Sequence, residues 1–479
     1  MLKIIYEYKK ILIFDEFFYL DFDNGQCSKK IEDLLFFLDE NSLTPPEYSL
    51  DLYKKITICI ESTDMCNFNC KYCFNKQKGN FLFKYDKKIE HILNSIFERY
   101  KNSEKFFIDL SGDGEPLLNI NFIKKLIDYV EKKQEEIRKE INISFVCNGS
   151  LLDENIVNFL QKNGIIFGVS FDGPKQIHNK NRINADGSKT YDLILNNIKK
   201  IKHKEFLGAA VTLTNDVFDL TKNFIEFLNY FGTISYKFVR YEKENKLTDD
   251  AVDKWIYEYN KLASFLVSET LNRNFRPIFS LLNGDDYFGK FLCLSFKNNL
   301  PFNRCDAGVG RIFINQNYDI FPCAPLAKYS NYRIGNGIFF NENFLKNLYY
   351  DGLNKSDCSK CDFAKLCGGE CIVEKEINLG VNNSMCKIKK HLVLLSKYVF
   401  LKISENNYCF EKILNFIDLK FRNTYMDNIY KKIVNKYKDK TFKECKEYYY
   451  RIINQDKNQH LFGSVNLEYM EEIYEKYNF

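Results

Sequence analysis

The sequence predicts an α/β fold whose parallel strands form a partial or complete barrel. Between residues 55 and 240, short runs of β-branched and aromatic residues alternate with longer stretches that have the spacing of amphipathic helices. Five such units followed by a sixth strand require parallel pairing with right-handed crossovers, which favours a partial (β/α)6 barrel. A flat doubly wound sheet is the alternative. In a barrel, the functional loops are expected at the carboxyl ends of the strands.

Each expected element of this region can be placed by its pattern. The strands are runs bounded by turn residues, at 56–60, 105–110, 141–147, 164–171, 206–214 and 234–239. The helices are stretches with apolar residues three and four apart, near 86–101, 120–139, 153–162, 190–204 and 217–230.

The flanking segments predict smaller units. Residues 1–54 are expected to form a hairpin around DFDNG and one helix at 28–39, which is too little for an independent core. Residues 241–292 predict a helical linker, 293–390 a Cys-rich domain punctuated by glycine, and 391–479 a helical C-terminal region.

Composition excludes several classes of protein. The chain has 479 residues, 45% hydrophobic and 28% charged, a balance typical of globular proteins. Its net charge of +5 is spread over the whole length, so no basic field for nucleic acid is expected. The sequence contains no uninterrupted apolar run of about 18 residues, so no membrane span is expected. The N-terminal stretch has no small-residue cleavage site of a signal peptide. We therefore expect a cytoplasmic protein that binds neither nucleic acid nor membranes.

Sixteen cysteines contrast with only five histidines. In a reducing cytosol, clustered cysteines are typical ligands of a soft metal or an iron–sulfur cluster rather than disulfides. The first cluster, Cys66-x3-Cys70-x2-Cys73, lies in the loop after the first predicted strand. Three thiolates can hold three corners of an iron–sulfur cube and leave one iron open to a ligand. A structural zinc site completed from elsewhere is the alternative.

This loop resembles the cluster motif of the radical S-adenosylmethionine (SAM) superfamily, and the resemblance covers about residues 55–390. It implies a [4Fe–4S] cluster on the three cysteines, SAM on the open iron, and Tyr72 beside the adenine. The loop after the second strand, Ser111-Gly-Asp-Gly-Glu-Pro, resembles the family's Gly-Gly-Glu-Pro element, with Asp113 in place of its first Gly. The resemblance implies that Gly114 and Glu115 contact the methionyl amino group; a glycine permits close backbone approach and a carboxylate suits an ammonium group.

Two further loops support the resemblance. Asn148 follows the third strand in Cys-Asn-Gly, which is similar to the family's Thr-Asn-Gly. Ser170 and Arg182 begin and end SFDGPKQIHNKNR after the fourth strand, which closely resembles the family's Ser-x-Asp-Gly-Pro-x3-His-x3-Arg. These two residues are expected to hold the SAM carboxylate and ribose, although Arg182 as a surface charge is the alternative. For His178 we favour a structural role at a helix end.

A second cysteine set lies downstream and is ordered as Cys305, Cys323, Cys358, Cys361, Cys367, Cys371 and Cys386. Zinc is the alternative for the four closely spaced cysteines at 358–371. The order resembles the SPASM domain of radical SAM enzymes, which implies two auxiliary [4Fe–4S] clusters. By the family's arrangement, the first takes Cys305, Cys323 and Cys371, and the second takes Cys358, Cys361, Cys367 and Cys386.

The first auxiliary site lacks a fourth ligand in this assignment. Cys293 stands upstream of Cys305 and is either that ligand or a buried apolar cysteine. Tyr318 replaces a glycine of the family's loop. The isolated cysteines are expected to serve packing or to lie on the surface, and they are Cys27, Cys59, Cys147, Cys409 and Cys445.

The resemblance implies a radical SAM enzyme that cleaves SAM to a 5'-deoxyadenosyl radical and oxidises a peptide or protein substrate. A flavodoxin- or ferredoxin-type electron donor is expected. Ribosomal peptide maturases that form thioether cross-links are the favoured class. Sulfatase maturation is the alternative, but those enzymes usually carry an acidic residue where Ala324 follows Cys323. A non-enzymatic electron carrier or zinc scaffold is the alternative from another class, and the SAM-type loops argue against it.

Substrate docking is a separate question. Residues 425–454 carry more Lys and Arg than Asp and Glu, with interleaved tyrosines. A solvated helical face is the favoured interpretation. The alternative is that this segment, or the N-terminal hairpin, binds an acidic leader peptide.

Overall fold

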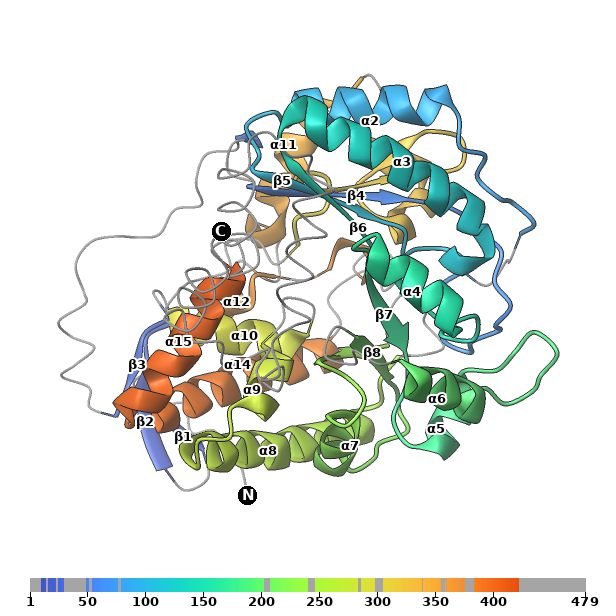
Figure 1. The fold of residues 1–479 in the computed structure, drawn as a ribbon. Helices are drawn as coiled ribbons and strands as arrows, with labels where there is room; N and C mark the ends of the chain where they lie inside the picture. The colour runs from blue at the N-terminus through green and yellow to red at the C-terminus, as the bar shows by residue number, and fades with distance from the viewer. Residues whose placement is uncertain are drawn as a thin grey trace, which may run out of the picture.

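The chain folds around an eight-stranded sheet with the strand order β11-β10-β4-β5-β6-β7-β8-β9 (Figure 1). The computed structural model describes residues 10–421, apart from 14–15, 23–24, 30–48, 51–53, 76–78, 202–206, 240–245, 283–285, 298–304, 338, 355–357, 359, 370 and 375–382. The expected docking segment 425–454, Cys445 and most of the helix at 28–39 lie outside the described residues.

Six parallel strands form the main part of the sheet. They are β4 (Lys55–Ile60), β5 (Lys105–Asp109), β6 (Glu140–Cys147), β7 (Ile166–Ser170), β8 (Gly208–Leu213) and β9 (Thr233–Phe238). The crossovers contain α2 (Lys87–Arg99), α3 (Ile120–Ile137), α4 (Glu154–Lys162), α5 (Lys175–Asn181), α6 (Tyr191–Lys200) and α7 (Leu220–Phe227). The predicted α/β fold with a partial barrel is therefore confirmed.

The strands have one face under helices and one inner face that remains accessible. In β8, Ala209, Val211 and Leu213 are buried, whereas the residues between them are partly exposed. β5, β7 and β9 alternate in the same way. On the inner face of β6, Val146 is 38% exposed. This alternation is what a sheet curved around an open interior requires.

The Cys-rich region adds two strands that the sequence analysis did not predict. β10 (Arg311–Ile314) pairs parallel with β4, and β11 (Ile320–Phe321) pairs antiparallel with β10. β10 thereby satisfies the outer backbone groups of β4, which would otherwise be an exposed edge. As a result, part of the Cys-rich region lies directly beside the strand that leads into the first cysteine loop.

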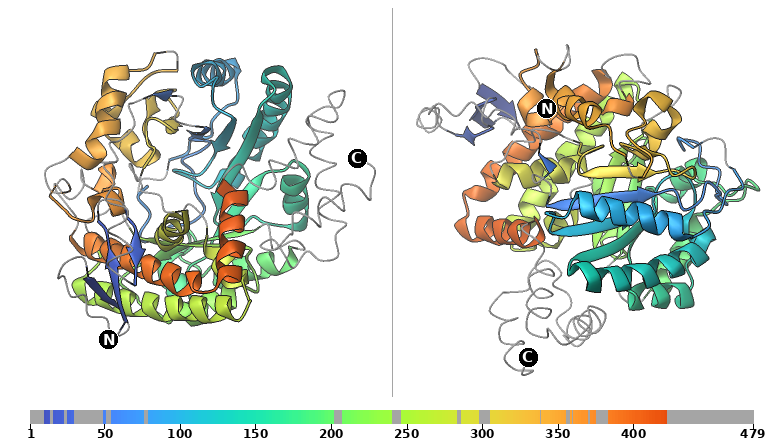
Figure 2. Two further views of the ribbon diagram at one scale, coloured as in Figure 1. Left: turned by 90° about the vertical axis from the view of Figure 1, so that its left-hand side faces the viewer. Right: turned by 90° about the horizontal axis from the view of Figure 1, so that it is seen from above.

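Helices cover the β9 end of the sheet. These are α8 (Asp249–Leu271), α9 (Arg276–Leu281), α10 (Tyr287–Lys297), α14 (Asn383–Ser404) and α15 (Asn407–Phe421). α14 packs along α8 and α10 (Figure 2). Buried polar pairs fix its position, because His391 lies 2.7 Å from Asn260 and the Ser396 hydroxyl lies 3.0 Å from that of Ser295.

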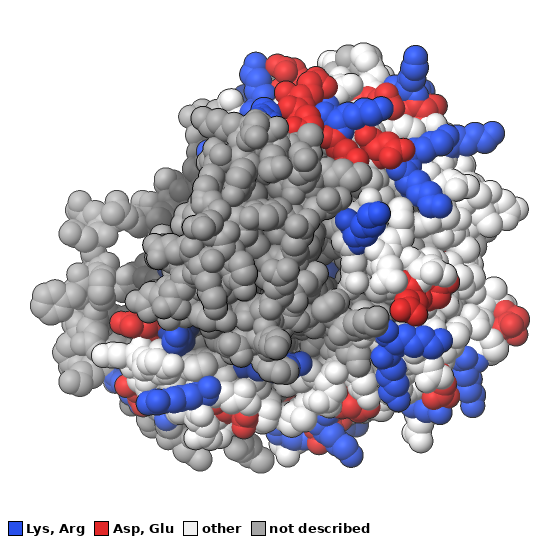
Figure 3. All heavy atoms as spheres, viewed as in Figure 1, with Lys and Arg blue, Asp and Glu red and all other residues white. Residues whose placement is uncertain are grey.

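The N-terminal segment forms a small sheet of β1 (Lys10–Ile13), β2 (Glu16–Leu20) and β3 (Cys27–Ser28). β2 and β3 pair antiparallel on either side of DFDNG, as the hairpin pattern predicted. Within the described ranges, no helix combines the length and hydropathy needed to cross a bilayer. On the described part of the face in Figure 3, basic and acidic side chains are interspersed.

Candidate functional site

The first cysteine loop follows the carboxyl end of β4. Its three thiols, those of Cys66, Cys70 and Cys73, are partly buried and close enough to influence one another. Burial raises the pKa of Cys70 to about 11; the Arg182 guanidinium lowers this pKa, and the thiols of Cys73 and Cys66 raise it. The loop therefore gathers soft thiol ligands around one place, as an iron–sulfur cube requires.

Backbone hydrogen bonds hold this loop against the segment after α5. The amide of Asn69 donates to Ile183 O at 2.8 Å, and the amide of Lys71 donates to Asn181 O at 2.9 Å. Phe68, between the first two cysteines, is only 1% exposed and anchors the loop in the core. The protein itself therefore determines the shape of the loop.

A buried polar network holds the part of the cysteine loop that contains Cys70 and Tyr72. Asp172 accepts hydrogen bonds from the Tyr72 hydroxyl, from Arg182 Nε at 2.9 Å and from the Thr212 amide at 2.8 Å. Arg182 Nη1 lies 4.0 Å from Cys70 Sγ, and the guanidinium lies 5.3 Å from the centre of the Tyr72 ring. Arg182 is thus a buried residue that supports the cysteine loop, in contrast to the surface-charge alternative.

His178 completes this network from α5. Its Nδ1 accepts the Asp172 amide at 3.1 Å, so Nε2 carries the proton and donates to Thr190 Oγ1 at 3.1 Å. The Thr190 hydroxyl donates in turn to Arg182 O at 2.8 Å. Burial lowers the pKa of His178 to about 4, which keeps the ring neutral at neutral pH. These contacts agree with the structural role expected of His178.

Gly114 lies directly under the cysteine loop. A Cβ atom at Gly114 would lie 2.4 Å from Met65 O and 2.5 Å from Thr63 O, so the position has no room for a side chain. The next amide, that of Glu115, donates to Met65 O at 2.8 Å. The glycine that the sequence analysis assigned to ligand approach is therefore needed for contact between two loops.

Glu115 joins the loops that follow β4, β5 and β6. Its Oε2 accepts the Asn148 amide at 2.7 Å and its Oε1 accepts the Leu117 amide at 3.2 Å. Asn148 Nδ2 donates to Asn67 Oδ1 in the cysteine loop at 2.7 Å. Burial raises the pKa of Glu115 to about 7, and its backbone donors lower it. Each carboxylate oxygen retains a lone pair, so both can accept a further donor from a ligand.

Ser170 lies at a strand end of this site, and Asn119 connects the loops around it. Ser170 ends β7 on the inner face with a partly exposed side chain, as a ligand-binding residue requires. Asn119 was not singled out from the sequence, yet its Nδ2 donates to Ser62 O at 2.7 Å and to Phe83 O at 3.1 Å. An isolated Asn at the start of a helix gives no signal of such a role.

The first auxiliary set comes together on the inner face of β4, β10 and β11. An apolar group there, the inner-face cluster, consists of Cys59, Phe313, Phe321, Leu326, Tyr332 and Val373. Cys323 and Cys371 pack against it. Burial raises the pKa of Cys323, the Leu326 amide lowers it, and the thiols of Cys371, Cys305 and Cys59 raise it. The three cysteines that were assigned together are therefore neighbours.

The second auxiliary set lies between α12 (Ala364–Cys367) and α14. The Cys361 amide donates to Cys358 O at 3.1 Å, Cys367 ends α12, and Cys386 lies in the first turn of α14, against which α12 packs. Among the described residues, no three Cys, His, Asp or Glu side chains surround a single ion. The thiolates of a cube bind different irons and stand farther apart than ligands of one ion.

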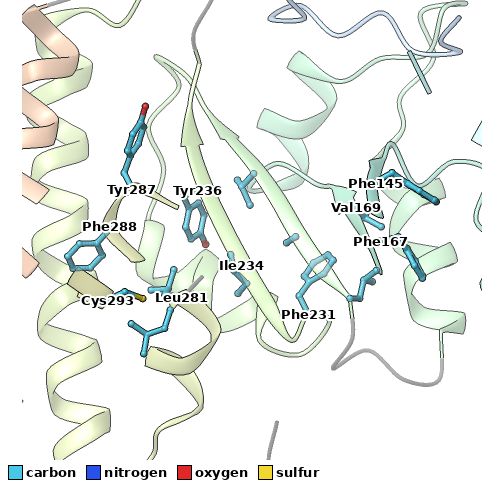
Figure 4. Packing of buried hydrophobic residues seen from close by; sticks show 14 of the residues in the cluster. Phe145, Phe167, Val169, Phe231, Ile234, Tyr236, Leu281, Tyr287, Phe288 and Cys293 are labelled. Atoms are coloured by element: carbon cyan, nitrogen blue, oxygen red, sulfur yellow. The ribbon is translucent and has the colours of Figure 1, made fainter. Parts of the chain in front are cut away.

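Cys293 lies elsewhere. It belongs to α10, is 6% exposed and packs in the main core with Phe288 and Leu281, beside β9 (Figure 4). β9 is at the opposite end of the sheet from β11. Its surroundings agree with the buried apolar alternative.

Comparisons with known proteins agree with this geometry. The Radical SAM superfamily model matches residues 60–228. The chain is 26% identical over 364 residues to the radical SAM cyclopropyl synthase TigE of Paramaledivibacter caminithermalis, covering 69% of this chain and 71% of TigE. It is 24% identical over 362 residues to the cysteine-type anaerobic sulfatase-maturating enzyme of Clostridium novyi. This match covers 69% of this chain and 92% of the Clostridium novyi enzyme.

A solved structure, native anSMEcpe with bound AdoMet, has the same fold with a TM-score of 0.57 at 21% identity, covering 73% of this chain and 99% of that chain. The chain therefore contains a radical SAM domain and is homologous to TigE and to the anaerobic sulfatase-maturating enzymes, which indicates a radical SAM enzyme.

Proposed function

We propose that this enzyme oxidises a peptide or protein side chain, with a [4Fe–4S] cluster on Cys66, Cys70 and Cys73 and SAM beside it. The observation that carries the proposal is the gathering of these thiols at the carboxyl end of β4, in a loop fixed by Asp172 and Arg182. When bound, the cluster and SAM supply one-electron chemistry that yields a 5'-deoxyadenosyl radical. The names of the relatives support a maturase, since they are a cyclopropyl synthase and sulfatase-maturating enzymes.

Residues around the loop have distinct proposed tasks. Glu115 faces the methionyl amino group, Gly114 lets its loop approach the cysteine loop closely, and Asn148 holds Glu115 in place. Tyr72, whose hydroxyl is bound to Asp172, presents a ring of fixed orientation to the adenine. Ser170 binds the carboxylate or ribose, while Arg182 positions Tyr72 and Cys70.

We further propose that the substrate lies on the inner face, where auxiliary clusters held by the downstream cysteines would be placed to accept an electron. Ser144, Val146, Thr212 and Lys237 offer partly exposed side chains there. The first auxiliary set borders the same face. Such an arrangement would suit a peptide maturase that forms a thioether cross-link and takes electrons from a flavodoxin- or ferredoxin-type donor.

Sulfatase-maturase-like oxidation is a second candidate, because the loop after β5, which carries Asp113, passes close to Ala324. A Cβ at Gly112 would lie 3.9 Å from Ala324 Cβ, which places the neighbouring Asp113 in this region. Burial raises the pKa of Glu61 to about 7, and Asp113 raises it as well. A group with such a pKa can accept a proton at neutral pH. Glu61 is therefore a candidate proton acceptor for this reaction in place of an acid after Cys323.

The test is SAM cleavage by the anaerobically reconstituted enzyme with dithionite. The variant with Cys66, Cys70 and Cys73 all changed to Ala should form no 5'-deoxyadenosine by chromatography. Cys358→Ala should retain uncoupled cleavage, because its thiol belongs to the other set. Equal loss in both variants, or full activity in the triple variant, would contradict the assignment of the SAM site.

A further inference from the structure

Cys59 is a buried cysteine that has charged as well as apolar neighbours. It lies on the inner face of β4 and is 5% exposed. Arg311 Nη1 donates to its Sγ at 3.3 Å, and Asp109 Oδ2 lies 4.0 Å from the same sulfur. Burial and the Asp109 carboxylate raise the pKa of Cys59, whereas Arg311 lowers it, so the guanidinium offsets part of the cost of a thiolate at this position. The sequence analysis had expected Cys59 to be an isolated packing residue.

The strand register connects Cys59 to the first auxiliary set. Phe313 of β10 is opposite Cys59 of β4, and Phe321 of β11 is opposite Phe313. All three belong to the inner-face cluster, against which Cys323 and Cys371 pack. Cys323 lies two residues after Phe321, at the end of this row. Cys59 therefore borders the same space as two cysteines of that set.

Arg311 connects Cys59 to the remaining cysteine. Its Nη1 contacts Cys59 Sγ, and its Nε lies 3.9 Å from an oxygen of Asp306, the residue after Cys305. The thiols of Cys371, Cys305 and Cys59 all raise the pKa of Cys323, so the three lie near it. Four cysteines are therefore neighbours beside the inner face, with Cys305 on the exposed side of the group.

We propose that Cys59 is the fourth thiolate of the [4Fe–4S] site that Cys305, Cys323 and Cys371 form, an inference that rests on the auxiliary cluster proposed above. A cube has four irons and its stable form is completed by four thiolates. The set otherwise has three, and Cys293 is packed in the main core beside β9 (Figure 4). Each thiol loses its proton on binding iron.

This assignment also gives Arg311 a role. Its guanidinium is partly exposed, pairs with Asp109 at 3.3 Å and contacts Cys59. A cation beside a buried thiolate offsets part of the cost of burying that charge. Hydrogen bonds to cluster sulfurs raise the reduction potential, so Arg311 positions and tunes the cluster.

The experiment uses the full chain with Cys66, Cys70 and Cys73 changed to Ala, so that the remaining iron reports on the auxiliary sites. This background should hold about eight irons, four per cube, and be EPR-silent when oxidised. Adding Cys59→Ala should remove about one iron and produce the oxidised signal of a [3Fe–4S] cluster, because an iron without a thiolate is easily lost. Cys293→Ala is the matched control and should leave iron and spectrum unchanged.

Cys59→Ser keeps the size of the side chain and provides a second variant. Its hydroxyl should retain the iron but shift the EPR signal and reduction potential of one reduced auxiliary cluster. An unchanged spectrum in Cys59→Ser and Cys59→Ala, in a background that holds both cubes, would overturn the inference while leaving the proposed function intact. Iron loss in Cys293→Ala alone would also overturn it. A background that binds no iron would reject the auxiliary clusters themselves.

Discussion

At the scale of single residues, buried polar groups hold the cysteine loop in shape. Asp172 is fully buried, and its charge is compensated by Arg182 and by two further hydrogen-bond donors. Such a pair contributes little net stability when intact, but removal of one partner leaves an isolated buried charge. The geometry of Tyr72 and Cys70 therefore depends on the buried pair of Asp172 and Arg182.

Arg182→Gln should lower the free energy of unfolding by about 3–5 kcal/mol, because Asp172 would lose its buried partner. It should also lower iron incorporation at the first cysteine loop. Urea denaturation of the metal-free protein measures the first effect. The control is Lys180→Gln two residues away, whose pair with Asp216 is exposed; it should cost less than about 1 kcal/mol. Equal effects of the two substitutions would contradict this role of Arg182.

Glu61 predicts a pH dependence of stability. Burial raises its pKa from 4.5 to about 7, so the folded state binds the proton more tightly than the unfolded state. The associated stability is fully present below pH 4.5 and is lost as pH rises through 7. The loss is about 3 kcal/mol at about 1.4 kcal/mol per pKa unit.

Glu61→Gln should remove the loss of stability that the wild type shows as pH rises from 4.5 through about 7. Urea denaturation of the metal-free protein over this pH interval measures it. The exposed Glu98 of α2 supplies the control, and Glu98→Gln should preserve the wild-type profile. If Glu61→Gln and the wild type have parallel profiles, the raised pKa is refuted.

At the scale of elements, the loops after adjacent strands support each other. The loop after β5 approaches the loop after β4 so closely that Gly114 has no space for a Cβ. Glu115 then bonds the loop after β6. Because parallel strands end at the same edge, residues far apart in the chain meet there. The geometry of the cysteines is thus a property of several elements together.

Gly114→Ala should displace the cysteine loop and cost about 1–3 kcal/mol through overpacking against backbone that has no room to move. It should also reduce iron at the first site. Gly112→Ala is the neighbouring control: its Cβ would meet nothing nearer than Phe313 at 3.6 Å, an ordinary contact. The comparison is made by iron analysis and urea denaturation; similar results for the two variants would contradict the close contact.

At the scale of the whole molecule, the C-terminal helices and the sheet share one core. Leu394 and Leu395 of α14 are fully buried in that core, and α14 also carries Cys386. The second auxiliary set therefore depends on how α14 packs against α8 and α10. Cluster assembly and folding of the C-terminal helices are expected to be coupled.

Leu395→Ala should lower the free energy of unfolding by about 2–5 kcal/mol, because a buried leucine leaves a cavity. It should also weaken iron binding at the second auxiliary set. Lys387→Ala, on the same helix with an exposed pair to Asp253, should change stability by less than about 1 kcal/mol. Urea denaturation and iron analysis provide the measurements. Unaltered iron in a destabilised Leu395→Ala variant would argue against the coupling.

Much of the fold and part of the candidate site were accessible from the sequence. The positions of β4 to β9 along the chain follow from local alternation, since apolar periodicity records which face of an element is buried. The cysteine loop is recognisable because its ligands are adjacent in the chain. The position of Ser170 at a strand end likewise follows from a local pattern.

Other features depended on contacts between distant segments. β10 pairs with β4 across about 250 residues, and no local pattern encodes such a partner. That pairing brings Arg311 onto Cys59, so a cysteine expected to serve packing lies beside Cys323 and Cys371. The sequence by itself determined the barrel and its first cysteine site, because both follow from the spacing of residues that are close together in the chain. Only the tertiary structure decided which isolated residues share a site, because proximity in space arises from the path of the whole chain.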